Sequence, residues 1–149
     1  MNIGIKDSTK TVDLLNKLLA NELVLYQKTR NFHWNVEGPH FNDLHKLFEE
    51  QYDELAEHGD EIAERVRTLG HRPLSTMTEA LEAASLQEKP CDFPKAEAMV
   101  EQLLADHEQI IRELREMIDQ VEDVGSEDFL TGLLQAHEKT AWMLRSVNA

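Results

Sequence analysis

The sequence contains little of what marks a secreted or membrane-spanning chain. Among its 149 residues there is a single cysteine, Cys91, so no intrachain disulfide can form and a disulfide-stapled scaffold is excluded. Apolar residues occur in runs of only a few, which excludes a transmembrane helix and the apolar segment of a secretory signal. We therefore expect a cytoplasmic protein.

Basic residues are also scarce. Lys and Arg number 15 against 29 Asp and Glu, for a net charge of −14. Duplex DNA binding draws its affinity from cationic side chains that displace counterions from phosphates. The N-terminal stretch MNIGIKDSTKT carries only Lys6 and Lys10, and the C-terminal stretch carries Arg145. We expect direct DNA binding to be weak or absent and no membrane partner.

Gly and Pro, with six and four copies, divide the chain into four long segments. The segments begin near Ser8, at Gly38, after Asp92 and at Ser126. Apolar residues recur in each at steps of three, four and seven, as in amphipathic helices, and no stretch shows sustained period-two alternation. Asp92 is the expected N-cap of the third helix, with Pro94 in its first turn, and Gly70 ends the second. The protein is predicted to be all-α.

The lengths of the connections set the predicted topology. The first and second helices are joined by a few residues, as are the third and fourth, so each pair forms an antiparallel hairpin. Residues 70–92 form a long crossover, in which Thr76-x-x-Glu79 has the pattern of a capping box that opens a short helix. Two hairpins and one crossover predict a ferritin-like four-helix bundle, a single domain over 1–149 with a short tail at 1–7.

Ferritin-like bundles can carry a di-iron site built from Glu-x-x-His motifs. The one match here, Glu37-x-x-His40, spans the Gly38-Pro39 turn, so we expect no such site inside the bundle. His107 and His137 follow core spacing and are interpreted as hydrogen-bonded core residues. For His58 two interpretations stay open, a surface residue or part of a secondary metal site.

Candidate metal ligands instead lie on one flank of the second helix. At ~100° per residue they fall between about 40° and 140° from Phe41, beside the apolar stripe. These residues are His45, Glu49, Asp60 and Glu64. Small residues on the same helix, Ala56, Gly59 and Ala63, are compatible with close approach of another helix. A solvated charged flank is the alternative interpretation of Asp60 and Glu64.

Distance decides how these ligands can meet. Fifteen residues separate His45 from Asp60, about 22 Å along a helix, so the two cannot bind one ion within one chain. A second copy with its helix antiparallel would bring Asp60 and Glu64 opposite His45, with two identical sites about a two-fold axis. His33, just before the turn, can lie beside His45; a hydrogen-bonded buried imidazole is its alternative interpretation. Mixed imidazole and carboxylate ligation suits Fe(II) and Zn(II).

Two stretches of the sequence resemble a known family. HWNVEGPHFNDLHKLFE (residues 33–49) and DEIAERVRTLG (residues 60–70) are similar to the signature stretches of the Dps family, DNA-binding proteins from starved cells. The resemblance extends over essentially the whole chain. It implies a ferritin-like fold, a hollow homo-oligomeric shell of twelve subunits, and ferroxidase centres at two-fold interfaces.

The resemblance also implies roles for individual residues. His33, His45, Asp60 and Glu64 match ferroxidase ligands, which are both metal-binding and catalytic, and Glu49 matches a position that helps to hold a second iron. Trp34 matches an aromatic beside the centre, with packing as the alternative. The implied activity is oxidation of Fe(II), preferably by hydrogen peroxide, with ferric mineral stored in the cavity and DNA and cell protected from oxidative damage. Zn²⁺ is a competing ion.

Acidic residues near the turn between the third and fourth helices complete the set. Asp123 and Asp128 resemble acids that line the three-fold pores of the family, where a negative field concentrates cations. Helix-end acids in solvent are the alternative. Two other functions remain open for the chain: a nucleoid protein that binds and compacts DNA, and an inert helical oligomer that binds Zn²⁺ at the same ligands.

Overall fold

The computed structural model describes residues 2–149, and these form five helices and no strand. The helices are α1 (Thr9–Asn35), α2 (Phe41–Thr68), α3 (Met77–Ala83), α4 (Ala96–Ile118) and α5 (Val124–Val147). The predicted all-α class is therefore confirmed. None of the described helices combines the length and the apolar character needed to cross a lipid bilayer.

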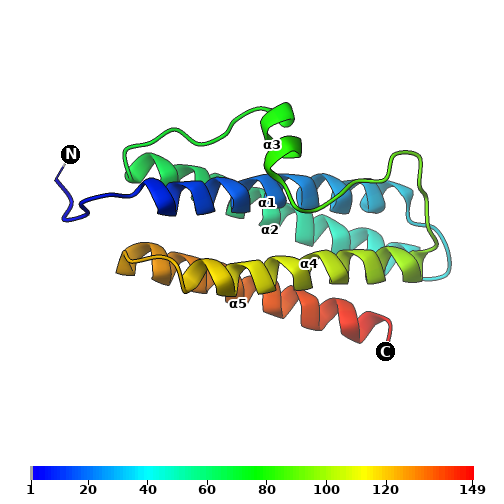
Figure 1. The fold of residues 1–149 in the computed structure, drawn as a ribbon. Helices are drawn as coiled ribbons and strands as arrows, with labels where there is room; N and C mark the ends of the chain where they lie inside the picture. The colour runs from blue at the N-terminus through cyan, green and yellow to red at the C-terminus, as the bar shows by residue number, and fades with distance from the viewer. Residues whose placement is uncertain (1) are drawn as a thin grey trace.

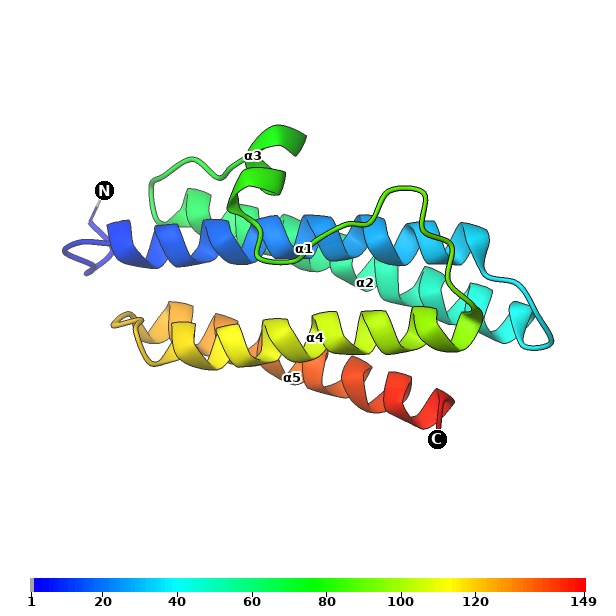
Figure 2. The same ribbon diagram turned by 45° about the vertical axis from the view of Figure 1, so that its right-hand side comes forward.

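The four long helices form two antiparallel hairpins that pack as two layers (Figure 1). α1 pairs with α2, α4 pairs with α5, and α1 also lies against α4 across the layers. The crossover from α2 to α4 carries α3, which packs on the outside of α1, and then runs along the bundle to the start of α4 (Figure 2). This is the ferritin-like arrangement that the connection lengths predict.

The core between the layers consists of the predicted apolar stripes. The largest fully buried side chains include Leu15, Phe48, Ile62, Leu103 and Leu144. Gly59 belongs to this buried side of α2: a Cβ built on it would lie 3.8 Å from Leu19 Cδ1 of α1. Gly59 thus lies where another helix approaches α2 closely, as expected, and that helix is α1 of the same bundle.

The starts of α2 and α4 differ from the sequence prediction. α2 begins at Phe41, after a turn in which Gly38 has a φ of +116° and accepts a hydrogen bond from the Phe41 amide. Pro39 thus belongs to this turn and precedes the helix. α4 begins at Ala96 with Lys95 at the N-cap position, and Asp92 is not its cap. Pro94 disfavours helical backbone at the residue before it, and Lys95 is itself extended, so the helix cannot begin earlier.

Local capping explains the remaining boundaries. Thr76 and Glu79 form the predicted capping box of α3, with the Glu79 carboxylate accepting from the Thr76 amide over 2.8 Å. Gly70, with a φ of +86°, ends α2 as predicted. α5 begins at Val124, earlier than the predicted Ser126, because the Asp123 carboxylate accepts from the Ser126 amide over 2.8 Å and caps the helix.

A buried asparagine fixes the crossover on the bundle. The Asn21 side-chain oxygen accepts from the amides of Ser85 and Leu86, and its Nδ2 donates to Glu113 on α4 over 2.8 Å. These bonds satisfy the polar groups of a buried residue while joining α1, the crossover and α4. The crossover is thus held in register with the two helices that it spans.

Candidate metal centre

His33 and His45 form a tightly organised pair at the turn between α1 and α2. His33 lies in the last turn of α1 and His45 near the start of α2. Their rings stack with centroids 3.8 Å apart and planes 13° from parallel. His33 Nδ1 donates to the main-chain oxygen of His45 over 2.6 Å, and His45 Nδ1 donates to that of His33 over 2.7 Å.

The end of α1 explains one of these two hydrogen bonds. The His33 carbonyl is one of the last four carbonyl groups of α1, which find no N–H donor within the helix and need a donor from elsewhere. A carbonyl oxygen can only accept a hydrogen bond, so each imidazole carries a proton on Nδ1. Each Nε2 is then left with a lone pair, and neither makes a hydrogen bond within residues 2–149. Metal-binding histidines in proteins are oriented by the same device.

Aromatic side chains enclose the pair. Tyr52 meets the His33 ring edge-on with centroids 5.2 Å apart, and Phe41 stacks on His45 at 5.0 Å. Partial desolvation, with the nearby Glu49 carboxylate, raises the pKa of the Tyr52 hydroxyl. His33 is buried, as its position on the core-facing stripe predicts, and His45 is half-buried. The pair therefore opens to solvent on the His45 side.

The two carboxylates predicted to share the ion lie elsewhere in the subunit. Asp60 and Glu64 are exposed on the second half of α2, and Glu49 is exposed one turn beyond His45. α2 is one unbroken helix, so His45 and Asp60 are separated by about 22 Å along it, as expected from 15 residues of helix. The chain brings His33 and His45 together and keeps Asp60 and Glu64 away from them. A site with all four ligands thus requires a second subunit, and it stays a prediction.

The remaining predicted residues lie on the surface or at a helix end. Trp34 is 57% exposed and packs against the Arg30 guanidinium at 5.1 Å from the ring centroid. Asp128 is exposed. Asp123 caps α5 and pairs with Arg65 over 2.6 Å. Hydrogen bonding from Ser126, together with Arg65, lowers the pKa of the Asp123 carboxyl.

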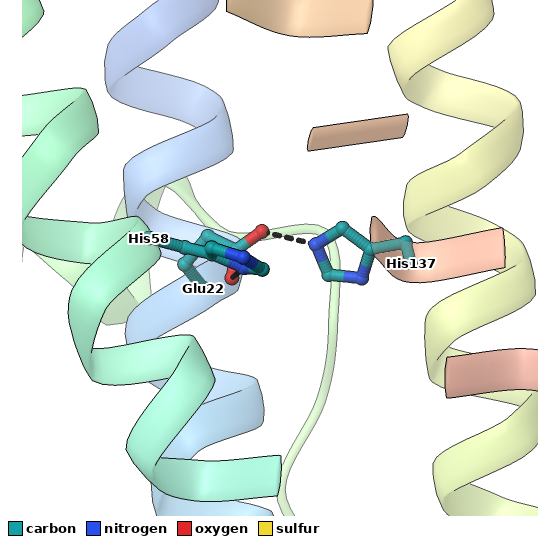
Figure 3. Close-up of side chains that lie close together, drawn as sticks. All are labelled: Glu22, His58 and His137. Carbon is teal, nitrogen blue, oxygen red and sulfur yellow. Dashed lines mark hydrogen bonds and ion pairs between the residues drawn. The ribbon is translucent and has the colours of Figure 1, made fainter. Parts of the chain in front are cut away.

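The structure also contains a second cluster, of which only His58 was a candidate metal-site residue from the sequence. Glu22 of α1, His58 of α2 and His137 of α5 each place one potential ligand atom within 4.8 Å of the others (Figure 3). His137 Nε2 donates to one Glu22 oxygen over 2.5 Å, and His58 Nδ1 lies 3.7 Å from the other. Complete burial works to raise the pKa of Glu22, but His137 and His58 outweigh it and hold the pKa below its ordinary value.

A third imidazole, that of His107, lies next to this cluster. His107 of α4 is buried, and its Nδ1 lies 2.8 Å from Nδ1 of His137. Burial, with the neighbouring His137, lowers the pKa of His107 to about 3, so its ring is neutral. One sequence signal could have indicated the cluster: Glu22 lies seven residues after Leu15 and three before Leu25 on the apolar face of α1. An acid there needs a buried partner.

Comparison with known proteins identifies the family. A model of the ferritin-like domain matches residues 12–149. The chain is 48% identical to a low temperature-induced protein of Nostoc over 98% of this chain and 85% of that protein. It is 44% identical to DNA protection during starvation protein 2 of Bacillus anthracis, over 92% and 95% of the two chains.

A solved structure gives the same result. The Dps protein of Vibrio cholerae, described as a member of the ferritin-like diiron-carboxylate superfamily, superimposes with a TM-score of 0.91 at 31% identity over 100% and 97% of the two chains. The resemblance to the Dps family is thereby confirmed. This chain belongs to the Dps family of ferritin-like proteins.

Proposed function

We propose that this chain is a ferroxidase that oxidises Fe(II) at a centre shared by two subunits and stores the ferric product in a hollow shell of twelve. The observation that supports it most is the His33–His45 pair. Both rings present a free Nε2, and both are fixed by hydrogen bonds through Nδ1. Imidazole nitrogens held in this way are suited to bind Fe(II), which is the substrate here.

The carboxylates of the centre come from the neighbouring copy. Asp60 and Glu64 are exposed, and their carboxylates accept no hydrogen bond within residues 2–149. An antiparallel α2 from a second subunit, related by a two-fold axis near Asp53, places them opposite His45. Glu49, exposed one turn after His45, is positioned to help hold a second iron. Oxygen ligands stabilise Fe(III), the harder ion, and so favour oxidation.

Two irons at one centre match the chemistry of peroxide. Each of two Fe(II) ions gives one electron to one hydrogen peroxide, and with two protons the peroxide becomes two water molecules. The transfer of both electrons at one place avoids the hydroxyl radical that one-electron reduction would release. Trp34, adjacent in sequence to His33, is assigned as a quencher of oxidising equivalents that escape. Its exposed ring and its contact with Arg30 are consistent with that role.

The acidic turn before α5 is the proposed route for iron into the shell. Asp128 is an exposed acid, whereas the negative charge of Asp123 is offset by its ion pair with Arg65. A negative field of this kind concentrates cations. Because Asp123 also caps α5, its replacement is expected to alter the turn itself, and Asp128 is the cleaner test of the pore.

Protection of DNA follows from removal of iron and peroxide. Relatives carry the name DNA protection during starvation protein, and the net charge of −14 provides little cation to bind phosphate. We therefore assign the protein a cytoplasmic role as an iron store and peroxide scavenger, without direct compaction of DNA. Zn²⁺ is expected to compete with Fe(II) for the same ligands.

Stopped-flow absorbance tests the proposal. Fe(II) mixed with the assembled protein is expected to give ferric absorbance rapidly with hydrogen peroxide and more slowly with oxygen. The variant D60N should lose this rapid phase, while its shell still elutes as the wild type does in size-exclusion chromatography. Equal rates for D60N and wild type would contradict the proposed centre.

A further inference from the structure

Inside the bundle, well apart from the His33–His45 pair, each long helix contributes one ionisable side chain to a common point. These are Glu22, His58, His107 and His137, and three of them are almost fully buried, at 0%, 2% and 1% exposure for Glu22, His107 and His137. Figure 3 shows Glu22 and His58 side by side, with His137 reaching toward them from the opposite hairpin. Ionisable groups at such depth need mutual partners or a metal ion.

The hydrogen bonds within the cluster leave several of its atoms without a partner. Glu22 Oε2, His58 Nδ1 and His107 Nε2 are buried polar atoms that make no hydrogen bond within residues 2–149. Glu22 Oε2 and His58 Nδ1 face each other over 3.7 Å, which is too long for a hydrogen bond. Buried atoms without partners are rare in folded proteins. Here two of them face each other.

We propose that Glu22, His58 and His137 form a second metal site, within one subunit, for a single divalent transition-metal ion with the preferences of Zn²⁺. One carboxylate and two imidazoles are a ligand set used for Zn²⁺ and for mononuclear iron. The three potential ligand atoms already lie within 4.8 Å of one another. Ligand atoms around a tetrahedral Zn²⁺ are about 3.3 Å apart, so binding requires small side-chain shifts.

His107 is a positioning residue in this site. When His137 Nε2 binds a metal, its Nδ1 carries the proton and can donate to His107 Nδ1, 2.8 Å away. His107 thereby fixes the tautomer that frees Nε2 as a ligand, as second partners of metal-bound histidines do. Without a metal ion on Nε2, that nitrogen can instead donate its proton to Glu22, as in the hydrogen bond between His137 and Glu22. The same four side chains thus accommodate both states.

The site also has an entrance. The His58 side chain is 12% exposed, and its Nε2 lies 3.8 Å from the Glu54 carboxylate, which is 45% exposed. A cation can therefore reach Glu22 past His58, with Glu54 at the surface to attract it. One carboxylate in the interior is too few for the di-iron arrangement of ferritin-like bundles, which uses a Glu from each of four helices. The site is therefore assigned to one ion.

Cobalt titration of the assembled protein tests the proposal. Co²⁺ reports a tetrahedral or five-coordinate protein site by its visible d–d absorption. The interface ligands are first removed with the changes H45N, D60N and E64Q. This parent protein is expected to bind one Co²⁺ per subunit, and Zn²⁺ should displace it. If the parent gives no d–d absorption and binds no Zn²⁺ in isothermal titration calorimetry, the proposal is wrong.

Single changes in the same parent locate the ion. E22Q keeps the acceptor for His137 and removes the charge, and H58N changes the residue at the entrance; each should weaken Co²⁺ binding at least tenfold. H40N, in the exposed turn before α2, is the matched control and should bind as the parent does. Zn²⁺ should raise the thermal midpoint of the parent and of H40N but not of E22Q. Unchanged Co²⁺ affinity in E22Q and H58N would overturn the assignment.

Discussion

His33 and His45 are held face to face by two crossed hydrogen bonds, in which each ring donates its Nδ1–H to the main-chain oxygen of the other residue over 2.6 and 2.7 Å. The pair thus joins the last turn of α1 to the start of α2. It also points both Nε2 atoms away from the backbone. The position of the ligands and the stability of the turn therefore depend on the same two bonds, and these can be separated by substitution.

The change H45N should remove the Nε2 ligand of residue 45 while keeping the hydrogen bond to the His33 carbonyl. The asparagine Nδ2 can replace the imidazole Nδ1 as donor to His33, while the Nε2 ligand is lost. We expect Fe(II) oxidation to slow by about tenfold or more, with the shell and its thermal midpoint little changed. The measurement is the stopped-flow rate with peroxide, and H40N in the nearby turn is the control. An H45N protein that oxidises iron at the wild-type rate would show that His45 is not a ligand.

The change G59A should stabilise the protein. Gly59 is helical and buried, and an added Cβ would meet only Leu19 Cδ1 at an ordinary 3.8 Å. Because alanine favours helix over glycine by up to ~1 kcal/mol, the free energy of unfolding in urea should rise by about 0.5–1 kcal/mol. G125A, whose Cβ would lie 3.0 Å from Arg65 Nη2, should show no such gain. Loss of shell assembly in G59A would mean that a neighbouring subunit, and not only α1, packs against Gly59.

Asp123 should make a pH-dependent contribution to stability. Ser126 and Arg65 lower the pKa of the Asp123 carboxyl in the folded chain. The stabilising effect of Asp123 is therefore complete above the ordinary pKa of 3.8, and it disappears as the pH falls through the lowered pKa of the folded chain. D123A removes the cap and the ion pair and should cost about 1 kcal/mol at neutral pH. In urea denaturation this difference from wild type should shrink below about pH 4. D128A, an exposed acid one turn on, is the control; a D123A deficit that is the same at acidic and neutral pH would refute the explanation.

Direct DNA binding should be undetectable at physiological salt. The net charge of −14 leaves few cations to displace counterions. A gel mobility-shift assay with linear duplex should show free DNA at all protein concentrations. In the same preparation, DNA should survive treatment with Fe(II) and peroxide. A retarded band that weakens steeply with added salt would instead favour the nucleoid-compacting alternative.

The sequence predicts features well where the chemistry is local. Thr76 and Glu79 lie three residues apart, so their capping box is visible in the sequence, and α3 begins where it predicts. The predicted start of α4 was wrong. Asp92 has the right residue type for a cap, but the backbone at Pro94 and Lys95 keeps the chain extended past it. α5 began earlier because Asp123 and Ser126 satisfy each other across Gly125.

Sites built from several helices depend on how the helices pack. The sequence was sufficient to predict the His33–His45 pair but not the cluster of Glu22, His58 and His137. The periodicity of α2 and the short turn predict that His33 meets His45, which the structure confirms. Glu22, His58 and His137 come from three helices and have no common motif, so only the relative rotation of the helices brings them together. The sharing of Asp60 and Glu64 between subunits lies beyond one chain altogether.

Co-assembled shells test the shared centre most directly. One chain carries H33N and H45N, the other carries D60N and E64Q, and each alone should be inactive in peroxide-dependent iron oxidation. Random mixing makes half of the two-fold pairs heterologous, and each of those has one intact centre, so the mixed shell should recover about a quarter of the wild-type rate. If mixed shells are assembled and remain inactive, the two imidazoles and the two carboxylates do not combine across the interface.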